Sequence, residues 1–102
     1  MAVIYLIESD QNGNITYKIG KTGRKTRNRL DELATGNAGK LRIIHEYHTD
    51  IPDELEIAVQ NSFSYCRLEG EWFSDELPID KFESMCNIFN TALHSIKKAS
   101  YY

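Results

Sequence analysis

The sequence VIYLIESDQNGNITYKIG, residues 3–20, decides the fold of this chain. Its two ends, residues 3–7 and 15–20, are rich in β-branched and aromatic residues, a composition that is typical of strands. Between them, Asn12 and Gly13 favour a tight turn, because both residues tolerate a positive φ angle. The stretch therefore predicts an antiparallel β-hairpin.

After the hairpin, the pattern predicts one helix and one more strand. The helix covers about residues 25–34, with Leu30 and Leu33 on its buried side, and ends near Gly36. Residues 41–49 are rich in aliphatic and aromatic side chains and are predicted to form the third strand.

Two further helices are predicted in the C-terminal half. The first begins with Asp50 as its cap and Pro52 in its first turn, and a short segment follows at residues 71–73. The last helix covers about residues 78–97, where apolar residues recur at steps of three and four. Residues 1–102 are thus expected to form a single α+β domain, a small three-stranded antiparallel sheet flanked by helices.

The composition indicates an intracellular globular protein. With 41% hydrophobic and 11% aromatic residues, a chain of 102 residues can bury one core. No segment approaches the roughly 20 apolar residues of a membrane span, and no basic region precedes the apolar N-terminus. Cys66 and Cys86 lie far apart and in no C-x-x-C spacing, so both are expected to be reduced core thiols in the cytoplasm.

Charge is distributed unevenly along the chain. Residues 16–48 hold eight basic and three acidic residues, a balance of +5, and the net charge of −3 leaves −8 for the remainder. A local basic segment can attract a polyanion although the total charge is negative, whereas the alternative interpretation is a solvated basic face. The candidates to contact nucleic acid are Lys21, Arg24, Lys25 and Arg27.

Several motifs resemble those of a known family. VIY at residues 3–5 and YKIGKT at residues 17–22 resemble the paired strand motifs of the GIY-YIG nuclease superfamily. Arg29 is similar to the helix arginine of that superfamily, and Glu56 with GEWF at residues 70–73 matches the branch common in phages and large DNA viruses. The motifs follow one another in the order expected for that superfamily.

This resemblance, which covers residues 3–75, implies an endonuclease that hydrolyses DNA with one Mg²⁺ or Mn²⁺ ion. The chain is expected to act with little sequence preference, and DNA is favoured over RNA as its nucleic-acid partner. In this interpretation Glu56 binds the metal, Arg29 clamps the phosphate, and Tyr5 and Tyr17 orient or deprotonate the attacking water. A nearby cation is expected to lower the pKa of such a phenol. The implied catalytic set is Tyr5, Tyr17, Lys18, Arg29 and Glu56.

Departures from the motifs leave a second hypothesis open. Val3 replaces a glycine, Lys18 replaces a tyrosine, and Gln60 stands where relatives often carry a histidine. These changes favour a catalytically inactive module that binds nucleic acid or a protein. Tyr17 shares a strand face with Ile19, so core packing is an alternative role for it.

Two other properties stay open at the level of sequence. The excess of acid outside residues 16–48 allows an acidic mimic of DNA, although the basic segment argues against it. The apolar stripe of the last helix either completes the core or is partly buried in a dimer, so the chain is expected to be a monomer or a weak homodimer, with no membrane partner.

Overall fold

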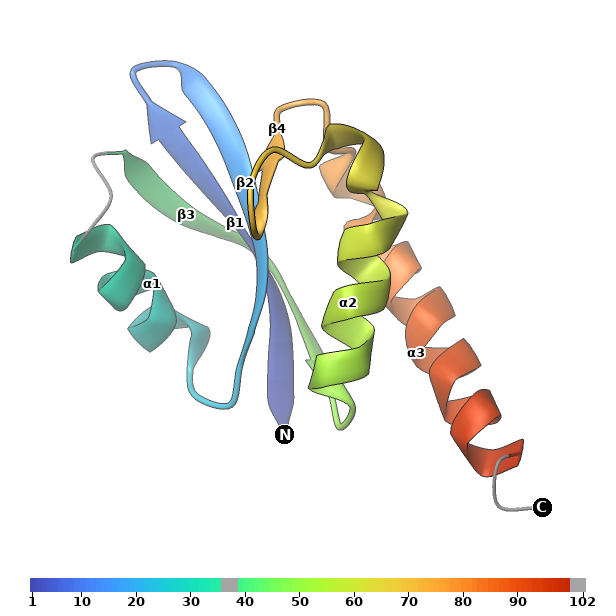
Figure 1. The fold of residues 1–102 in the computed structure, drawn as a ribbon. Helices are drawn as coiled ribbons and strands as arrows, with labels where there is room; N and C mark the ends of the chain where they lie inside the picture. The colour runs from blue at the N-terminus through green and yellow to red at the C-terminus, as the bar shows by residue number, and fades with distance from the viewer. Residues whose placement is uncertain (36–38, 100–102) are drawn as a thin grey trace.

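A computed structural model describes residues 1–35 and 39–99, which form a four-stranded antiparallel sheet with helices on both faces (Figure 1). The strand order is β3-β1-β2-β4. The strands are β1 (Ala2–Gln11), β2 (Asn14–Thr22), β3 (Lys40–Thr49) and β4 (Trp72–Ser74). The helices are α1 (Thr26–Thr35), α2 (Pro52–Ser62) and α3 (Phe82–Ala99), with short 3-10 turns η1 (Ser64–Cys66) and η2 (Ile79–Lys81).

The predicted α+β class and the hairpin are confirmed. Asn12 and Gly13 have φ angles of 55° and 88°, and the amide of Gly13 donates a hydrogen bond of 2.8 Å to the carboxylate of Asp10. The turn sets the register of β1 and β2, in which Tyr5 lies opposite Gly20. The predicted end of the first helix near Gly36 falls outside the described residues.

The prediction of three strands was one too few. Residues 71–73 were expected only as a short segment, but β4 pairs with β2 so that Trp72 lies opposite Lys18 and Phe73 opposite Tyr17. The amide of Ile19 also donates to the carbonyl of Glu71 at 3.1 Å. A strand of three residues is too short to show a periodic pattern, so its pairing is decided by tertiary contacts.

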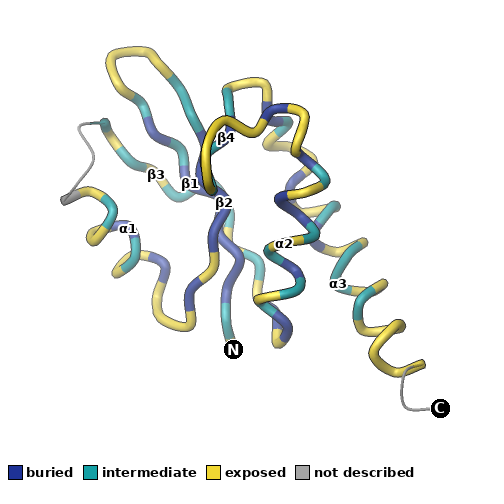
Figure 2. The backbone as a smooth tube through the Cα atoms, viewed as in Figure 1, coloured by how far each residue is buried: buried dark blue, intermediate teal, exposed yellow. Residues whose placement is uncertain are grey.

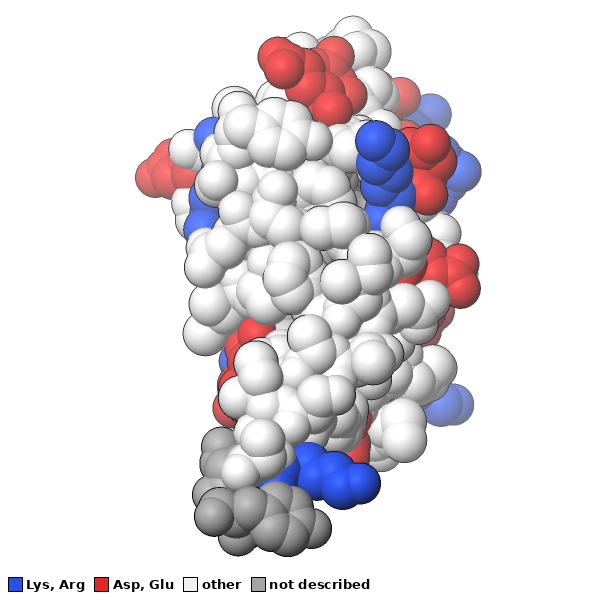
Figure 3. Space-filling view, turned by 90° about the vertical axis from the view of Figure 1, so that its right-hand side faces the viewer, with Lys and Arg blue, Asp and Glu red and all other residues white. Residues whose placement is uncertain are grey.

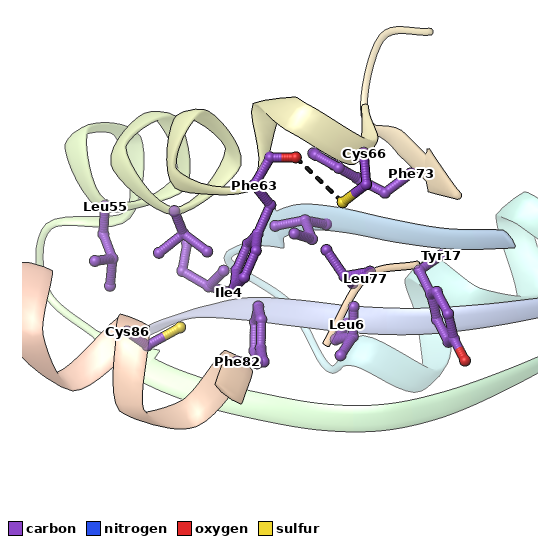
Figure 4. Close-up of a cluster of buried hydrophobic side chains, with 12 residues drawn as sticks. Ile4, Leu6, Tyr17, Leu55, Phe63, Cys66, Phe73, Leu77, Phe82 and Cys86 are labelled. Carbon is purple, nitrogen blue, oxygen red and sulfur yellow. Dashed lines mark hydrogen bonds between the residues drawn. The ribbon is translucent and has the colours of Figure 1, made fainter. Parts of the chain in front are cut away.

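The sheet separates two clusters of buried side chains. The larger cluster lies between the sheet and helices α2 and α3, and its members include Ile4, Tyr17, Phe63, Phe73 and Phe82 (Figure 4). The smaller cluster lies under α1 on the other face (Figure 1) and consists of Val3, Tyr5, Ile7 and Leu30. Figure 2 shows burial concentrated along the sheet, whereas the last turns of α3 are exposed.

Two expectations about single residues have different outcomes. Cys66 and Cys86 are free and buried, as expected, and burial raises the pKa of Cys86 to about 12. The prediction that Asp50 caps α2 was wrong, because Ile51 is the N-cap residue and no side chain caps the helix. The carboxylate of Asp50 instead lies 2.9 Å from the imidazole of His94 on α3.

Candidate functional site

Tyr5 stands at the centre of the α1 face of the sheet. Its side chain is 1% exposed, and its phenol ring lies directly over Gly20 on β2. A Cβ atom at position 20 would lie 2.3 Å from the phenol oxygen, closer than real Cβ atoms approach other heavy atoms. Glycine at this position therefore makes room for the ring of Tyr5.

Arg29 reaches the same phenol from α1. Its Nε donates a hydrogen bond of 3.4 Å to the Tyr5 oxygen, and its Nη1 lies 3.1 Å from the carboxylate of Glu32. The expectation of a lowered phenol pKa was wrong, because burial raises the pKa of Tyr5 and the opposing effect of Arg29 is smaller. Tyr5 therefore keeps its proton at neutral pH.

Glu56 approaches this region from α2. Its side chain is 13% exposed, and Gln60, one turn later on the same helix, donates a hydrogen bond of 2.8 Å to the carbonyl of Ile19 on β2. This bond holds α2 against the edge of β2. Burial, together with the carboxylate of Glu71, raises the pKa of Glu56. The site therefore places a carboxylate where its negative charge is poorly solvated.

Two lysines on β2 lie next to these carboxylates. The ammonium of Lys18, a residue that is 7% exposed, lies 3.7 Å from Glu71 and 5.3 Å from the ring centroid of Trp72. The ammonium of Lys21 lies 2.7 Å from Asp53 and 3.9 Å from Glu56. We call this group the Glu56 cluster, which consists of Tyr5, Lys18, Lys21, Arg29, Glu56 and Glu71.

Tyr17 lies on the opposite face of the sheet from Tyr5. Tyr5 lies opposite Gly20, and side chains alternate along a strand, so Lys18 shares the face of Tyr5 while Tyr17 lies on the other. Tyr17 packs with Phe73 in the larger core cluster, and burial raises the pKa of its phenol. Its predicted alternative role in core packing agrees with this position.

The predicted contacts to nucleic acid are divided between two places. Lys21 belongs to the Glu56 cluster, and Arg24 pairs with Glu32. Lys25 and Arg27 are exposed at the start of α1, where they line a hollow of about 490 Å³. Their exposure leaves both side chains accessible to a ligand.

Two acidic neighbours of the site lie outside the predicted catalytic set. Glu71 belongs to the GEWF segment but joins the Glu56 cluster because β4 pairs with β2. Asp53 precedes Glu56 by almost one helical turn, and both carboxylates face Lys21. The spacing of three residues along α2 is the one signal in the sequence that connects Asp53 with the site.

The residues present fit one divalent cation held mainly by Glu56. Within residues 1–35 and 39–99, no three His, Cys, Asp or Glu side chains are arranged to hold a metal ion. Mg²⁺ needs fewer protein ligands, because it keeps several water molecules and takes phosphate oxygens. Burial is the main cause of the raised pKa of Glu56, and the carboxylate of Glu71 adds to it.

Fold and site together define a small α+β domain in which Arg29 of α1 contacts the Tyr5 phenol of β1 and Glu56 of α2 lies beside Lys21 of β2. The T5orf172 domain family matches residues 2–91, so the chain belongs to this family. T5orf172 domains are associated with phage proteins and with nucleases of the GIY-YIG kind. Neither the curated proteins nor the solved structures include a match to the chain. No helix within the described residues is long and apolar enough to cross a membrane.

The raised pKa of Glu56 predicts a pH-dependent stability difference. The folded protein binds the Glu56 proton more tightly than the unfolded chain, whose glutamates titrate near 4.5. Ionised Glu56 therefore lowers the free energy of unfolding at neutral pH, and this cost disappears as pH falls through the raised pKa toward 4.5. We expect Glu56→Gln to be more stable than the wild type at pH 7, with a difference that shrinks on acidification.

Urea denaturation without metal, from about pH 7 to about pH 4.5, measures this difference. A variant that is less stable than the wild type at pH 7, or a difference that does not change with pH, would contradict the expected environment of Glu56.

Proposed function

We propose that the chain is a metal-dependent endonuclease that hydrolyses DNA phosphodiester bonds with little sequence preference. The observation that supports this proposal is the contact of Arg29 on α1 with the phenol of Tyr5 on β1, with Glu56 on α2 beside Lys21 of the neighbouring strand. Glu56 contributes to the electrostatic environment of the Tyr5 phenol, which Arg29 also contacts. Membership of the T5orf172 family adds support.

Arg29, Lys18 and Lys21 stabilise the negative charge that develops on the phosphate oxygens during cleavage. The Arg29 side chain is 35% exposed, so part of its planar guanidinium remains accessible to a phosphate. Its contact with Glu32 limits the orientations that it can adopt. The two lysines add fixed positive charge beside the reacting group.

Glu56 would hold Mg²⁺ or Mn²⁺, and a bound ion supplies Lewis acidity and a water molecule of lowered pKa. Lys21 lies closer to Asp53 than to Glu56, by 2.7 Å against 3.9 Å, so the carboxylate of Glu56 is not fully engaged by the ammonium. Tyr5 accepts the hydrogen bond of Arg29 and burial raises the pKa of its phenol, which supports a role in orienting the nucleophilic water or a phosphate oxygen.

Substrate binding depends on phosphate contacts. Lys25 and Arg27 extend the positive charge beyond the Glu56 cluster along the start of α1. Contacts to phosphates fix the position of DNA without reading its sequence, and they weaken steeply with salt. Little sequence preference and strongly salt-dependent affinity follow.

We expect wild-type protein to nick supercoiled plasmid with Mg²⁺ or Mn²⁺ and to be inactive in EDTA. Arg29→Ala is expected to reduce the rate by about 10²–10³-fold, the usual effect of removing one donor that stabilises transition-state charge. Agarose gels measure the rate. The matched control is Arg42→Ala, because Arg42 is an exposed arginine that pairs with Glu8 away from the site.

Equal nicking by wild type and Arg29→Ala would contradict the assigned role of Arg29, and no cleavage by the wild type would contradict the proposed activity.

A second candidate function is that of an inactive binding module. Gln60, which stands in place of a titratable histidine, is buried and engaged with the carbonyl of Ile19. Mn²⁺ titration by calorimetry separates the two functions: retained DNA affinity with no metal binding supports the inactive module.

A further inference from the structure

Helix α3 presents an outer surface that differs from that of most surface helices. From Ser84 to Ile96 it contains no Lys, Arg, Asp or Glu. The outer face of a surface helix ordinarily carries charged residues, so their absence from this stretch is unusual. Figure 3, which looks onto the side where α3 lies, shows a broad uncharged surface with charged residues at its margins.

Two polar side chains of α3 are hydrogen-bonded to β3. Asn87 accepts a hydrogen bond of 2.8 Å from the hydroxyl of Tyr47, and Asn90 accepts one of 2.8 Å from the hydroxyl of Thr49. The apolar residues Ile88 and Ile96 are instead 59% and 61% exposed. The helix thus directs amides toward β3 and two isoleucines toward solvent.

The exposed residues Ile88, Ala92 and Ile96 form a symmetric stripe. They follow one another at steps of four, so they lie along one side of the helix with the small residue in the middle. If two copies cross antiparallel at Ala92, Ile88 of each copy meets the partner subunit's Ile96. Such a self-complementary surface is what a two-fold interface requires, and a small central residue lets the helix axes approach closely.

We propose that this stripe is the interface of a homodimer in which two α3 helices pack antiparallel across a two-fold axis at Ala92. The lack of charge on this surface favours a second copy of the chain over a charged partner. An uncharged surface offers no ion pair to the phosphates of nucleic acid. It also adds no local repulsion when two chains of net charge −3 meet there. The proposal does not depend on the nuclease function. Pairing leaves Arg29 accessible, because α1 lies on the other face of the sheet (Figure 1).

Sedimentation equilibrium tests the proposal. We expect a concentration-dependent dimer with a dissociation constant on the order of 1–100 µM, because one helix pair gives a small interface. Ile88→Lys and Ile96→Lys are each expected to weaken association at least about tenfold while the melting temperature stays unchanged, since both side chains are largely exposed. The matched control is Leu68→Lys, at a leucine that is 59% exposed outside α3.

Crosslinking provides a second measurement that locates the axis. Ala92→Cys is expected to form a covalent dimer rapidly under mild oxidation, whereas Glu69→Cys, at an exposed residue outside α3, is not. The native Cys66 and Cys86 are buried and do not compete. A wild-type protein that stays monomeric in this concentration range, or a dimer that both lysine variants leave intact, overturns the proposal.

Discussion

Glu56→Gln is expected to reduce metal-dependent DNA cleavage by about 10²–10³-fold, because it removes the carboxylate proposed to hold the divalent ion while it keeps the shape of the side chain. The fold is expected to remain intact, since a neutral amide replaces a carboxylate whose buried position raises its pKa. Rates of plasmid nicking at saturating Mn²⁺, together with circular dichroism of both proteins, measure the two effects.

Asp53→Asn is the matched control for this substitution. Asp53 contacts the same lysine as Glu56, from three residues earlier on α2, but its side chain is 72% exposed. We expect its loss to change the rate by less than about tenfold, as is usual for an exposed pair. If Asp53→Asn loses as much activity as Glu56→Gln, the metal site is not centred on Glu56.

Gly20→Ala is expected to affect both stability and activity. The added Cβ would lie 2.3 Å from the oxygen and 2.5 Å from Cζ of the Tyr5 phenol, which is buried and cannot swing aside freely. Overpacking of this kind lowers the free energy of unfolding by about 1–3 kcal/mol. Displacement of the phenol from Arg29 is expected to reduce cleavage about 10²-fold.

Gly23→Ala provides the control, because a Cβ at position 23 meets no heavy atom within 4 Å. Thermal melts and nicking rates of the two alanine variants can be compared directly. The cost of Gly20→Ala is also expected to be smaller in a Tyr5→Leu background, where the ring is absent. An equal cost in both backgrounds would show that the contact with Tyr5 is not its cause.

Local patterns were sufficient to predict the hairpin, the third strand and the three helices. Asn12 and Gly13 specify a tight hairpin turn, because both adopt positive φ angles. The apolar residues at steps of three and four within residues 78–97 specify one apolar face of a helix. The boundary of α2 was less predictable. Asp50 precedes Pro52 as a cap would, but its carboxylate pairs with His94, a contact that depends on how α3 packs.

The site was predictable in part. Motif order connected Tyr5, Arg29 and Glu56, and in the structure Arg29 contacts the Tyr5 phenol while Glu56 lies beside Lys21. The motif also included Tyr17, which lies in the core. Adjacent strand residues point to opposite faces, so Lys18 shares the face of Tyr5 and Tyr17 does not. Lys18 pairs with Glu71 on the Tyr5 side of the sheet, whereas Tyr17 packs in the core.

The sequence by itself determined the class of fold, the hairpin and the order in which the candidate groups occur, because these depend on neighbours along the chain. Tertiary structure alone decided that β4 adds a strand, that Glu71 thereby joins the Glu56 cluster, and that burial raises the pKa of Tyr5 and Glu56. These properties depend on contacts between residues far apart in sequence, and on the loss of water around each charged group, which no local pattern encodes.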